Sequence, residues 1–228
     1  TTDQGHNNKD LLYKVRPIRA FGNWTMGCMN ETACNYNPEA NMADGSCEYA
    51  QEGYDCEGNI NVQIGDETFG GIVFYIDESG QHGLVVAMED LTEGATIDSE
   101  GNPGYQWGCF ATWLSGANGQ AIGTGYQNTL DIVAGCPETP IAASEALAYE
   151  SGDYSDWYLP SLNELNEMYN TIGTGGSEGN IGGFSSNWYW SSSESNNYGA
   201  YDVNFSDGST GNFSSKTKIV RVRPIRSF

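Results

Sequence analysis

The stretch "GGIVFYIDESGQHGLVVAM", residues 70–88, joins two runs of β-branched and aromatic residues through a short polar segment. The segment between the runs is "ESGQHG", residues 78–83, which contains the Ser and Gly residues that favour turns. Two apolar runs arranged in this way are typical of a β-hairpin. We therefore predict two antiparallel strands here and expect the rest of the chain to supply the elements that cover them.

Helical patterns fill the middle of the chain. In "LPSLNELNEMYNTIG", residues 159–173, Ser161 precedes Glu164 by three positions, as in a capping box, and an apolar stripe runs to Gly173. Two shorter helices are expected at residues 141–150 and 127–134. The tail, from "NWYWSSSES" to residue 228, has the pattern of strands joined by Gly and Asp turns. The fold class is α+β, and the last strand is expected to return and pair with the first.

Six cysteines form an even set with no C-x-x-C pair, which disfavours zinc ribbons and redox motifs. Four of them lie in residues 22–59, a region rich in Asn, Asp, Glu and Gly with little periodicity. We expect a small module that depends on disulfides for its order, and hence an oxidising, extracellular location. The pairing cannot be derived from the sequence. The predicted disulfide residues are Cys28, Cys34, Cys47, Cys56, Cys109 and Cys136.

The chain carries a nearly identical phrase at its two ends, "YKVRPIRAF" at residues 13–21 and "VRVRPIRSF" at residues 220–228. All nine Lys and Arg residues lie in these segments and their immediate flanks, and residues 22–215 contain none. The net charge of −21 therefore comes from a strongly acidic body. Such a body repels nucleic acid and anionic lipid, so neither is an expected partner, and no apolar run is long enough to insert into a membrane.

Six motifs, in order, resemble a family of bacterial surface domains that includes the C-terminal domain of a collagen-like adhesin. They are "GGIVFYID" with "GLVVAMED", "YQWGC", "IGTGYQNT", "DWYLPSLNEL", "YWSSSE" and "VRPIRSF". The resemblance implies a C-type-lectin-like superfold with antiparallel sheets, paired terminal strands and binding loops. Residues 27–50 are similar to a Cys-rich repeat of large secreted proteins from aquatic Bacteroidetes-type bacteria, which implies an extracellular array.

Since the resemblance implies that "VRPIR" plus an aromatic residue closes the domain, residues 1–21 are expected to be the terminal strand of a preceding copy or a docking arm. Residues 22–59 would be the Cys-rich spacer and residues 60–228 the C-type-lectin-like domain. We predict head-to-tail assembly, either as a covalent tandem repeat or as separate strand-docked subunits. An equally open alternative is that the arm folds back on its own domain. The predicted assembly residues are Leu11, Leu12, Tyr13, Lys14, Val15, Arg16, Pro17, Ile18, Arg19, Phe21, Arg221, Arg223 and Arg226.

Calcium is the expected cofactor, if the chain binds one. The loop "NYNPEANMADGSC" supplies hard oxygen donors, but it departs from the EF-hand spacing, and turn formation explains the same residues without an ion. The predicted ligands are Asn35, Asn37, Glu39, Asn41 and Asp44, with a weaker candidate set at Asp202, Asn204 and Asp207.

Glycan binding is the alternative function, because aromatic residues in the tail stand among Ser and Asn residues that can bind hydroxyl groups. The competing interpretation places Trp157 and Trp190 in the core. The predicted ligand-binding residues are Trp188, Tyr189, Tyr198 and Tyr201.

Catalysis is not expected. The two histidines, His6 and His82, lie in the basic arm and in the predicted hairpin turn, and the chain lacks the common hydrolase, metalloprotease and nucleotide-binding motifs. Four N-x-[ST] sequons are candidate glycosylation sites: Asn23, Asn30, Asn204 and Asn212. The predicted function is a non-catalytic adhesion or structural module that assembles into an extracellular or cell-surface fibre.

Overall fold

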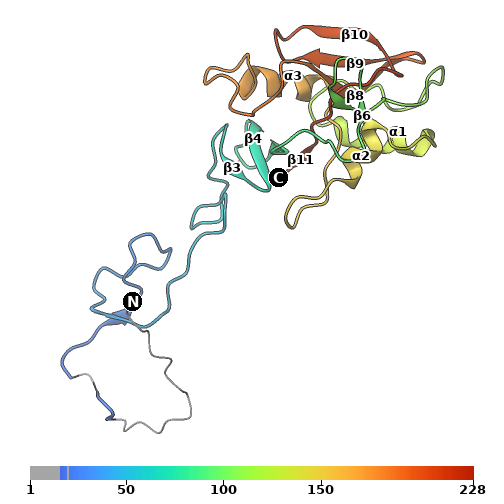
Figure 1. Cartoon of the computed structure of the whole chain (residues 1–228). Helices are drawn as coiled ribbons and strands as arrows, with labels where there is room; N and C mark the ends of the chain where they lie inside the picture. The colour runs from blue at the N-terminus through green and yellow to red at the C-terminus, as the bar shows by residue number, and fades with distance from the viewer. Residues whose placement is uncertain (1–15, 20) are drawn as a thin grey trace, which may run out of the picture. The chain divides into compact units, whose positions relative to one another are not determined.

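The computed structural model of the 228-residue chain describes residues 16–19 and 21–228 (Figure 1). The chain divides into two compact units, Thr1–Ala50 and Gln51–Phe228. In the described part of the chain, every helix is too short or too polar to cross a bilayer.

The first unit holds little regular structure. Its strands β1 (Met26–Gly27) and β2 (Met42–Ala43) pair in parallel, and a disulfide joins Cys28 to Cys47. Among the described residues of this unit, only Cys28 and Ala33 are buried hydrophobic residues. With so small a core, the disulfide must supply much of the order.

All six cysteines of the chain are disulfide-bonded, so this part of the sequence prediction is confirmed. A bridge joins Cys109 to Cys136 in the second unit, and Cys34 and Cys56 are likewise disulfide-bonded.

A four-stranded antiparallel sheet contains the predicted hairpin. Its strands are β3 (Glu67–Thr68), β4 (Gly71–Ile76), β5 (Gly83–Val86) and β11 (Ile225–Ser227), in the order β11-β5-β4-β3. Val85 pairs with Val73 on one side and with Arg226 on the other. The last strand therefore returns to the first hairpin, as predicted, but it pairs with β5, the second strand of that hairpin, and not with the first strand. This pairing places the C-terminus beside the hairpin (Figure 1).

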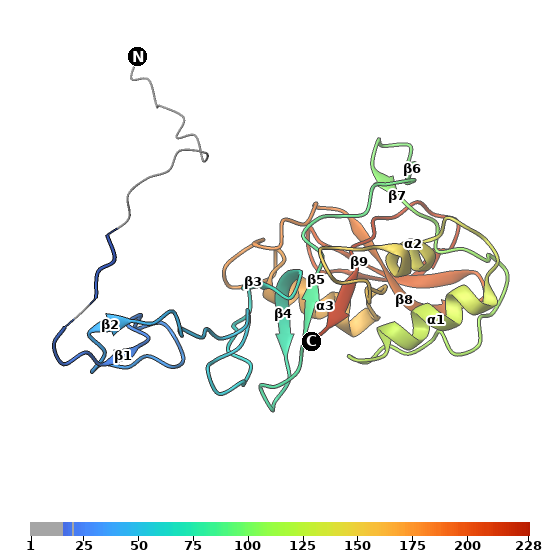
Figure 2. The same ribbon diagram turned by 90° about the horizontal axis from the view of Figure 1, so that it is seen from below.

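A second antiparallel sheet is formed by the tail strands β8 (Trp188–Asn196), β9 (Gly199–Asn204) and β10 (Thr210–Ser215), in the order β10-β9-β8. A small hairpin of β6 (Thr96–Ile97) and β7 (Pro103–Gly104) projects from the body of the second unit (Figure 2).

The three predicted helices are present as α1 (Gly125–Gly135), α2 (Ala142–Ala148) and α3 (Leu162–Thr171). The capping box of α3 is also confirmed: Ser161 Oγ accepts a hydrogen bond from Glu164 N at 3.3 Å, and Glu164 Oε2 accepts one from Ser161 N at 2.6 Å. Because Glu164 is fully buried, desolvation raises its pKa.

The core of the second unit lies on both faces of both sheets. One cluster packs Phe74 and Ile225 of the four-stranded sheet against Leu165 of α3 and against Tyr189 and Val203 of the other sheet. A second cluster covers the opposite face of the four-stranded sheet. Its buried members are Phe69, Val73, Val85, Ala87 and Trp157. A third cluster covers the other face of β8 and β9 with α1 and α2, and it includes Trp107, Ile132, Ala142, Trp190 and Ala200.

Candidate functional site

The last segment of the chain, residues 216–228, holds every cation of the second unit, and most of these cations bind carboxylates of that unit. Lys216 is fully buried. Its Nζ donates hydrogen bonds to Glu194 Oε1 and to the Thr112 carbonyl at 2.7 Å, and it lies 4.6 Å from the centroid of the Trp107 ring. Burial lowers the pKa of Lys216, and the adjacent Glu194 carboxylate opposes that shift.

Asp90 binds two arginines of this segment. Arg221 Nη1 lies 3.0 Å from Asp90 Oδ2, and Arg223 Nε lies 2.6 Å from Asp90 Oδ1. The Tyr189 hydroxyl donates to Asp90 Oδ2 at 2.9 Å, and burial raises the pKa of that hydroxyl. Arg223, only 2% exposed, also donates to the carbonyls of Ala87, Met88 and Gly182. This arginine therefore ties the terminal segment to the hairpin and to the loop before β8.

Arg226 makes a bidentate pair with Asp156, with Nε at 2.6 Å from Oδ1 and Nη2 at 3.0 Å from Oδ2. Its Nη1 donates to the Phe69 carbonyl at 3.1 Å, and its guanidinium lies 4.2 Å from the centroid of the Tyr154 ring. Burial would raise the pKa of Asp156, but the hydrogen bonds and charge of Arg226 hold it below its ordinary value.

These contacts correct one part of the assembly prediction. Arg221, Arg223 and Arg226 bind carboxylates of their own unit, so they do not form a free surface for another copy. At the other end, Arg16, Pro17, Ile18, Arg19 and Phe21 are exposed, with 97% exposure for Ile18 and 86% for Phe21. The remaining predicted residues lie outside the described part of the chain: Leu11, Leu12, Tyr13, Lys14 and Val15.

A polar cleft of about 710 Å³ lies beside the three-stranded sheet. Trp188 and Asn204 are direct cross-strand partners in β8 and β9, and both line this cleft. Lys218 lines it too, with Nζ 5.3 Å from the centroid of the Trp188 ring. The other lining residues are Ile97, Asp98, Ser99, Glu100, Ser186, Asn187, Ser206, Ile219 and Val220.

Asp202 lies on β9 next to this cleft. Its side chain is fully buried, and neither carboxylate oxygen has a hydrogen-bond partner. Lys218 Nζ is 4.0 Å from Oδ2. Burial raises the pKa of Asp202 to about 6, and the nearby Ser214 hydroxyl and Lys218 ammonium offset only part of that rise.

The four aromatic residues predicted to bind a ligand differ in burial and in position. Tyr189 is fully buried and cannot stack on a bound sugar, so its assignment is wrong, and Trp190 is also a core residue. Tyr201 is half-buried and packs against the core cluster that contains Tyr189. Tyr198 is exposed at the turn between β8 and β9, with its ring 5.3 Å from that of Phe110. Of the four, only Trp188 lines the cleft.

The predicted calcium loop uses its oxygen donors to shape turns. Asn35 Oδ1 accepts from Glu48 N, Asn37 Oδ1 from Glu39 N, Asn41 Oδ1 from Thr25 N, and Asp44 Oδ1 from Ser46 N, at 2.9–3.0 Å. Hydrogen bonds from Ser46 lower the pKa of Asp44. Calcium at this loop stays a prediction. In the weaker set, Asn204 and Asp207 accept from Ser206 and Ser209, whereas Asp202 is buried in the sheet.

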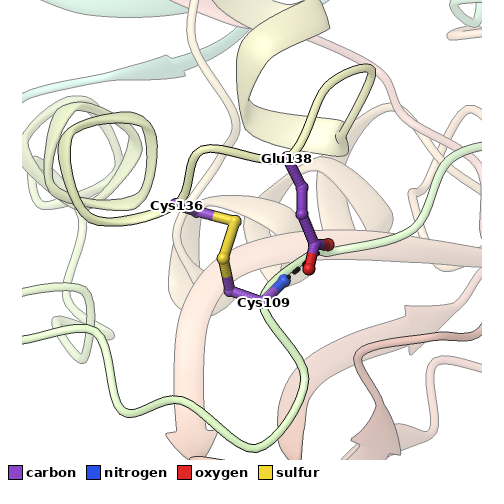
Figure 3. Close-up of side chains that lie close together, drawn as sticks. All are labelled: Cys109, Cys136 and Glu138. Atoms are coloured by element: carbon purple, nitrogen blue, oxygen red, sulfur yellow. Dashed lines mark hydrogen bonds between the residues drawn. A yellow bond between two sulfur atoms is a disulfide. The ribbon is translucent and has the colours of Figure 1, made fainter.

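Among the described residues, the one group of three potential His, Cys, Asp or Glu metal ligands is Cys109, Cys136 and Glu138 (Figure 3). Its two sulfur atoms are bonded to each other, and Glu138 Oε2 accepts a hydrogen bond from Cys109 N at 2.9 Å. A disulfide offers no thiolate, so the group fastens a loop to the end of α1 rather than forming a metal centre.

The four sequons differ in accessibility. Asn23, Asn30 and Asn212 are exposed, whereas Asn204 is half-buried in the cleft. The Asn30 Nδ2 donates to the Tyr49 hydroxyl at 2.8 Å, so a glycan on this atom would displace that contact.

Sequence reasoning missed the carboxylates that hold the terminal segment: Asp90, Glu194 and Asp156. In a chain with 30 acidic residues, composition alone cannot select three of them. The sequence held one signal for such contacts. All five cations of the second unit lie in one segment, and if that segment is buried, each buried cation needs a carboxylate nearby.

Comparison with known proteins identifies a family. The model of the Lcl C-terminal domain matches residues 106–226. The crystal structure of a fimbrial protein from Bacteroides ovatus ATCC 8483, at 1.85 Å resolution, is similar with a TM-score of 0.43 and 19% sequence identity. The alignment covers 81% of this chain and 51% of that one, so the chain spans about half the length of the fimbrial protein. A comparison with curated protein sequences finds no match.

Proposed function

The chain belongs to the Lcl C-terminal domain family, and from this premise we propose that it is a non-catalytic module of an extracellular or cell-surface fibre. The copies assemble head to tail through the basic N-terminal segment. The disulfide-bonded cysteines support an oxidising location. The C-type-lectin-like superfold is part of this proposal, and the pairing of β11 with the first hairpin favours it.

One observation supports assembly above the others: the described part of the N-terminal segment exposes apolar and cationic side chains together. Ile18 and Phe21 are almost fully exposed, and Arg16 and Arg19 flank Ile18. The next 194 residues of the chain contain no cation and 28 of the 30 acidic residues. An exposed segment that carries apolar side chains and positive charge therefore gains both burial and charge complementarity when it docks on such a body.

Deletion of residues 1–21 tests this role. We expect fibres of the native protein in electron microscopy, and folded, non-assembling copies after the deletion, as measured by circular dichroism and sedimentation. Fibres that persist without residues 1–21 would show that the segment is not the joint. Denaturing electrophoresis under reducing conditions separates the two architectures, because a tandem polypeptide keeps multiples of the repeat mass and docked subunits release single chains.

The charge of the segment has a matched test. The variant Arg16→Glu with Arg19→Glu should abolish assembly, and Arg16→Lys with Arg19→Lys should retain most of it. If both variants assemble equally well, the positive charge of Arg16 and Arg19 does not contribute to assembly.

Glycan binding is the second candidate function, and the cleft at Trp188 favours it. A half-buried tryptophan beside Asn187, Asn204 and Lys218 combines an aromatic ring, over which Lys218 Nζ lies at 5.3 Å from the centroid, with hydrogen-bonding groups. Trp188→Ala should abolish binding to a glycan array, whereas Tyr198→Ala, which lies outside the cleft, should not. If the parent protein binds no glycan on the array, this second function is wrong.

A further inference from the structure

Residues 9–21 and 216–228 are two versions of one thirteen-residue segment. Seven of the thirteen positions are identical, and Lys9, Lys14, Arg16 and Arg19 stand where Lys216, Arg221, Arg223 and Arg226 stand. The C-terminal version fills a well-defined position in the second unit, which we call the terminal slot. It comprises the sites for residues 216–228 beside β5, Asp90, Asp156 and Glu194.

The cations of the N-terminal version match the carboxylates of the terminal slot. In the slot, Glu194 binds the lysine at position 216, and Asp156 binds the arginine at position 226. Asp90 binds the arginines at positions 221 and 223. The N-terminal version has a cation at all four of these positions. Only one of the four differs in residue type: Lys14 stands in place of Arg221, which keeps the positive charge at the more exposed of the two Asp90 contacts.

The apolar positions match as well. Ile225 is fully buried in the core, and the Phe228 ring stacks on Phe69 with centroids 4.4 Å apart. Their counterparts Ile18 and Phe21 are 97% and 86% exposed. The N-terminal segment thus carries the side chains that fill the slot, but it exposes those two to solvent.

We propose that residues 9–21 occupy the terminal slot of another copy of this domain, one in which residues 216–228 do not fill that slot. This inference rests on the proposed assembly role and identifies its contact surface. A complete copy is a poor partner because its own segment is covalently attached and holds the slot at high effective concentration. The recipient is therefore either a domain body without its own final segment or a copy whose residues 216–228 leave the slot when residues 9–21 enter it. Head-to-tail assembly of separate complete chains requires the second case.

The differences between the two versions are compatible with the slot. Leu11 replaces Lys218, whose side chain is 51% exposed and whose carboxylate contact is long, at 4.0 Å. The most demanding change is Tyr13 for Val220, because Val220 is only 5% exposed and belongs to the core cluster that contains Trp107 and Trp190, although it also lines the cleft. The remaining changes are at positions 217, 219 and 227.

A graft into the full-length chain tests the match. Six substitutions give residues 216–228 the sequence of residues 9–21. They are Thr217→Asp, Lys218→Leu, Ile219→Leu, Val220→Tyr, Arg221→Lys and Ser227→Ala. We expect a folded protein with a cooperative transition and a Tm within about 10 °C of the parent, because Val220→Tyr enlarges a core side chain. The matched control adds Arg223→Glu and Arg226→Glu and should lose the cooperative transition. A graft that unfolds like this control would overturn the inference.

Occupancy by a separate segment is tested with peptides. In the full-length variant Ile225→Ala with Arg226→Ala, the native segment is weakened in its slot. A peptide of residues 9–21 should raise the Tm of this variant in a concentration-dependent manner, as a peptide of residues 216–228 should. The same 9–21 peptide with Arg16→Glu and Arg19→Glu should have no effect.

A rise in Tm with the 216–228 peptide alone would overturn the inference. Fibres of the parent that still depend on residues 1–21 would, in that case, leave the assembly role standing with a different contact surface.

Discussion

Lys216 donates a hydrogen bond from Nζ to Glu194 Oε1 in a place where neither side chain is exposed to solvent. The pair has supporting contacts, because Lys216 also donates to the Thr112 carbonyl and the Glu194 carboxylate accepts from Leu114 N. A buried pair of this kind fixes the start of the terminal segment against β8. Its net contribution to stability is nevertheless small compared with the cost of removing one partner.

We expect Lys216→Met to destabilise the second unit by about 3–5 kcal/mol, because Glu194 is left as an uncompensated buried charge. The double variant Lys216→Met with Glu194→Gln removes both charges and should be clearly more stable than Lys216→Met alone. Urea unfolding at pH 7 measures the difference. Equal stability of the single and double variants would show that the charge of Glu194 is not what makes the single variant unstable.

Asp202 makes stability depend on pH. Its pKa is about 6 in the folded protein, against an ordinary value of 3.8. The folded state therefore binds the proton more tightly, and stability falls as pH rises from about 4 to about 6. The loss is complete above that range and is on the order of 2–3 kcal/mol for a buried group.

Asp202→Asn removes this titration. Relative to the parent, the variant should gain stability as the pH rises from 4 to 6.5 and show no further change above that range. Urea midpoints at half-unit pH intervals provide the measurement. As a matched control, Asp207→Asn alters an exposed carboxylate in a nearby turn and should leave the slope between pH 4 and 6.5 unchanged. A parallel pH dependence for Asp202→Asn and the parent would contradict the assignment.

The two aspartates that bind arginines should differ strongly in importance. The Asp90 side chain is 10% exposed and accepts hydrogen bonds from Arg221, Arg223 and the Tyr189 hydroxyl. The Asp156 side chain is 54% exposed and binds Arg226. Asp90→Ala leaves Arg223 buried without its partner and should cost about 3–5 kcal/mol. Asp156→Ala leaves Arg226, whose side chain is 10% exposed, without its carboxylate, but water can take the exposed place of Asp156, so the cost should be smaller, about 1–2 kcal/mol.

Thermal or urea unfolding of the two variants ranks them directly. A larger loss at Asp156 would mean that solvent exposure of the carboxylate does not govern these pairs.

The elements of the second unit could be predicted because each has a local signal. The hairpin at residues 70–88 follows from β-branched runs around a turn, and α3 follows from Ser161 and Glu164 at capping-box spacing. The return of the last strand to the hairpin was predicted from the order of the elements along the chain, with strands at both ends and helices in the middle. These features depend on residues that are close in sequence or at the chain ends.

The site was less predictable because its contacts are long-range. Asp90 and Arg223 are 133 residues apart in the sequence. Glu194 lies on β8, whereas Lys216 directly follows β10. The sequence marked the cations of the terminal segment but not which carboxylates receive them. The aromatic prediction failed at Tyr189 because alternate residues of β8 point to opposite faces, and both faces of that strand are covered.

The loop fastened by Cys109 and Cys136 combines a covalent restraint with an unfavourable backbone. Cys109 has a φ of 49°, in the left-handed region that non-glycine residues rarely adopt. Removing the bridge in Cys109→Ser with Cys136→Ser should lower stability by about 3–4 kcal/mol through the unfolded-state entropy of a loop of this length. The variant Cys109→Gly with Cys136→Ser lacks the bridge as well, but it should recover about 1 kcal/mol because glycine adopts this φ without strain. Urea unfolding of both variants separates the covalent effect from the backbone effect, and a glycine variant less stable than the serine variant would argue against strain at this position.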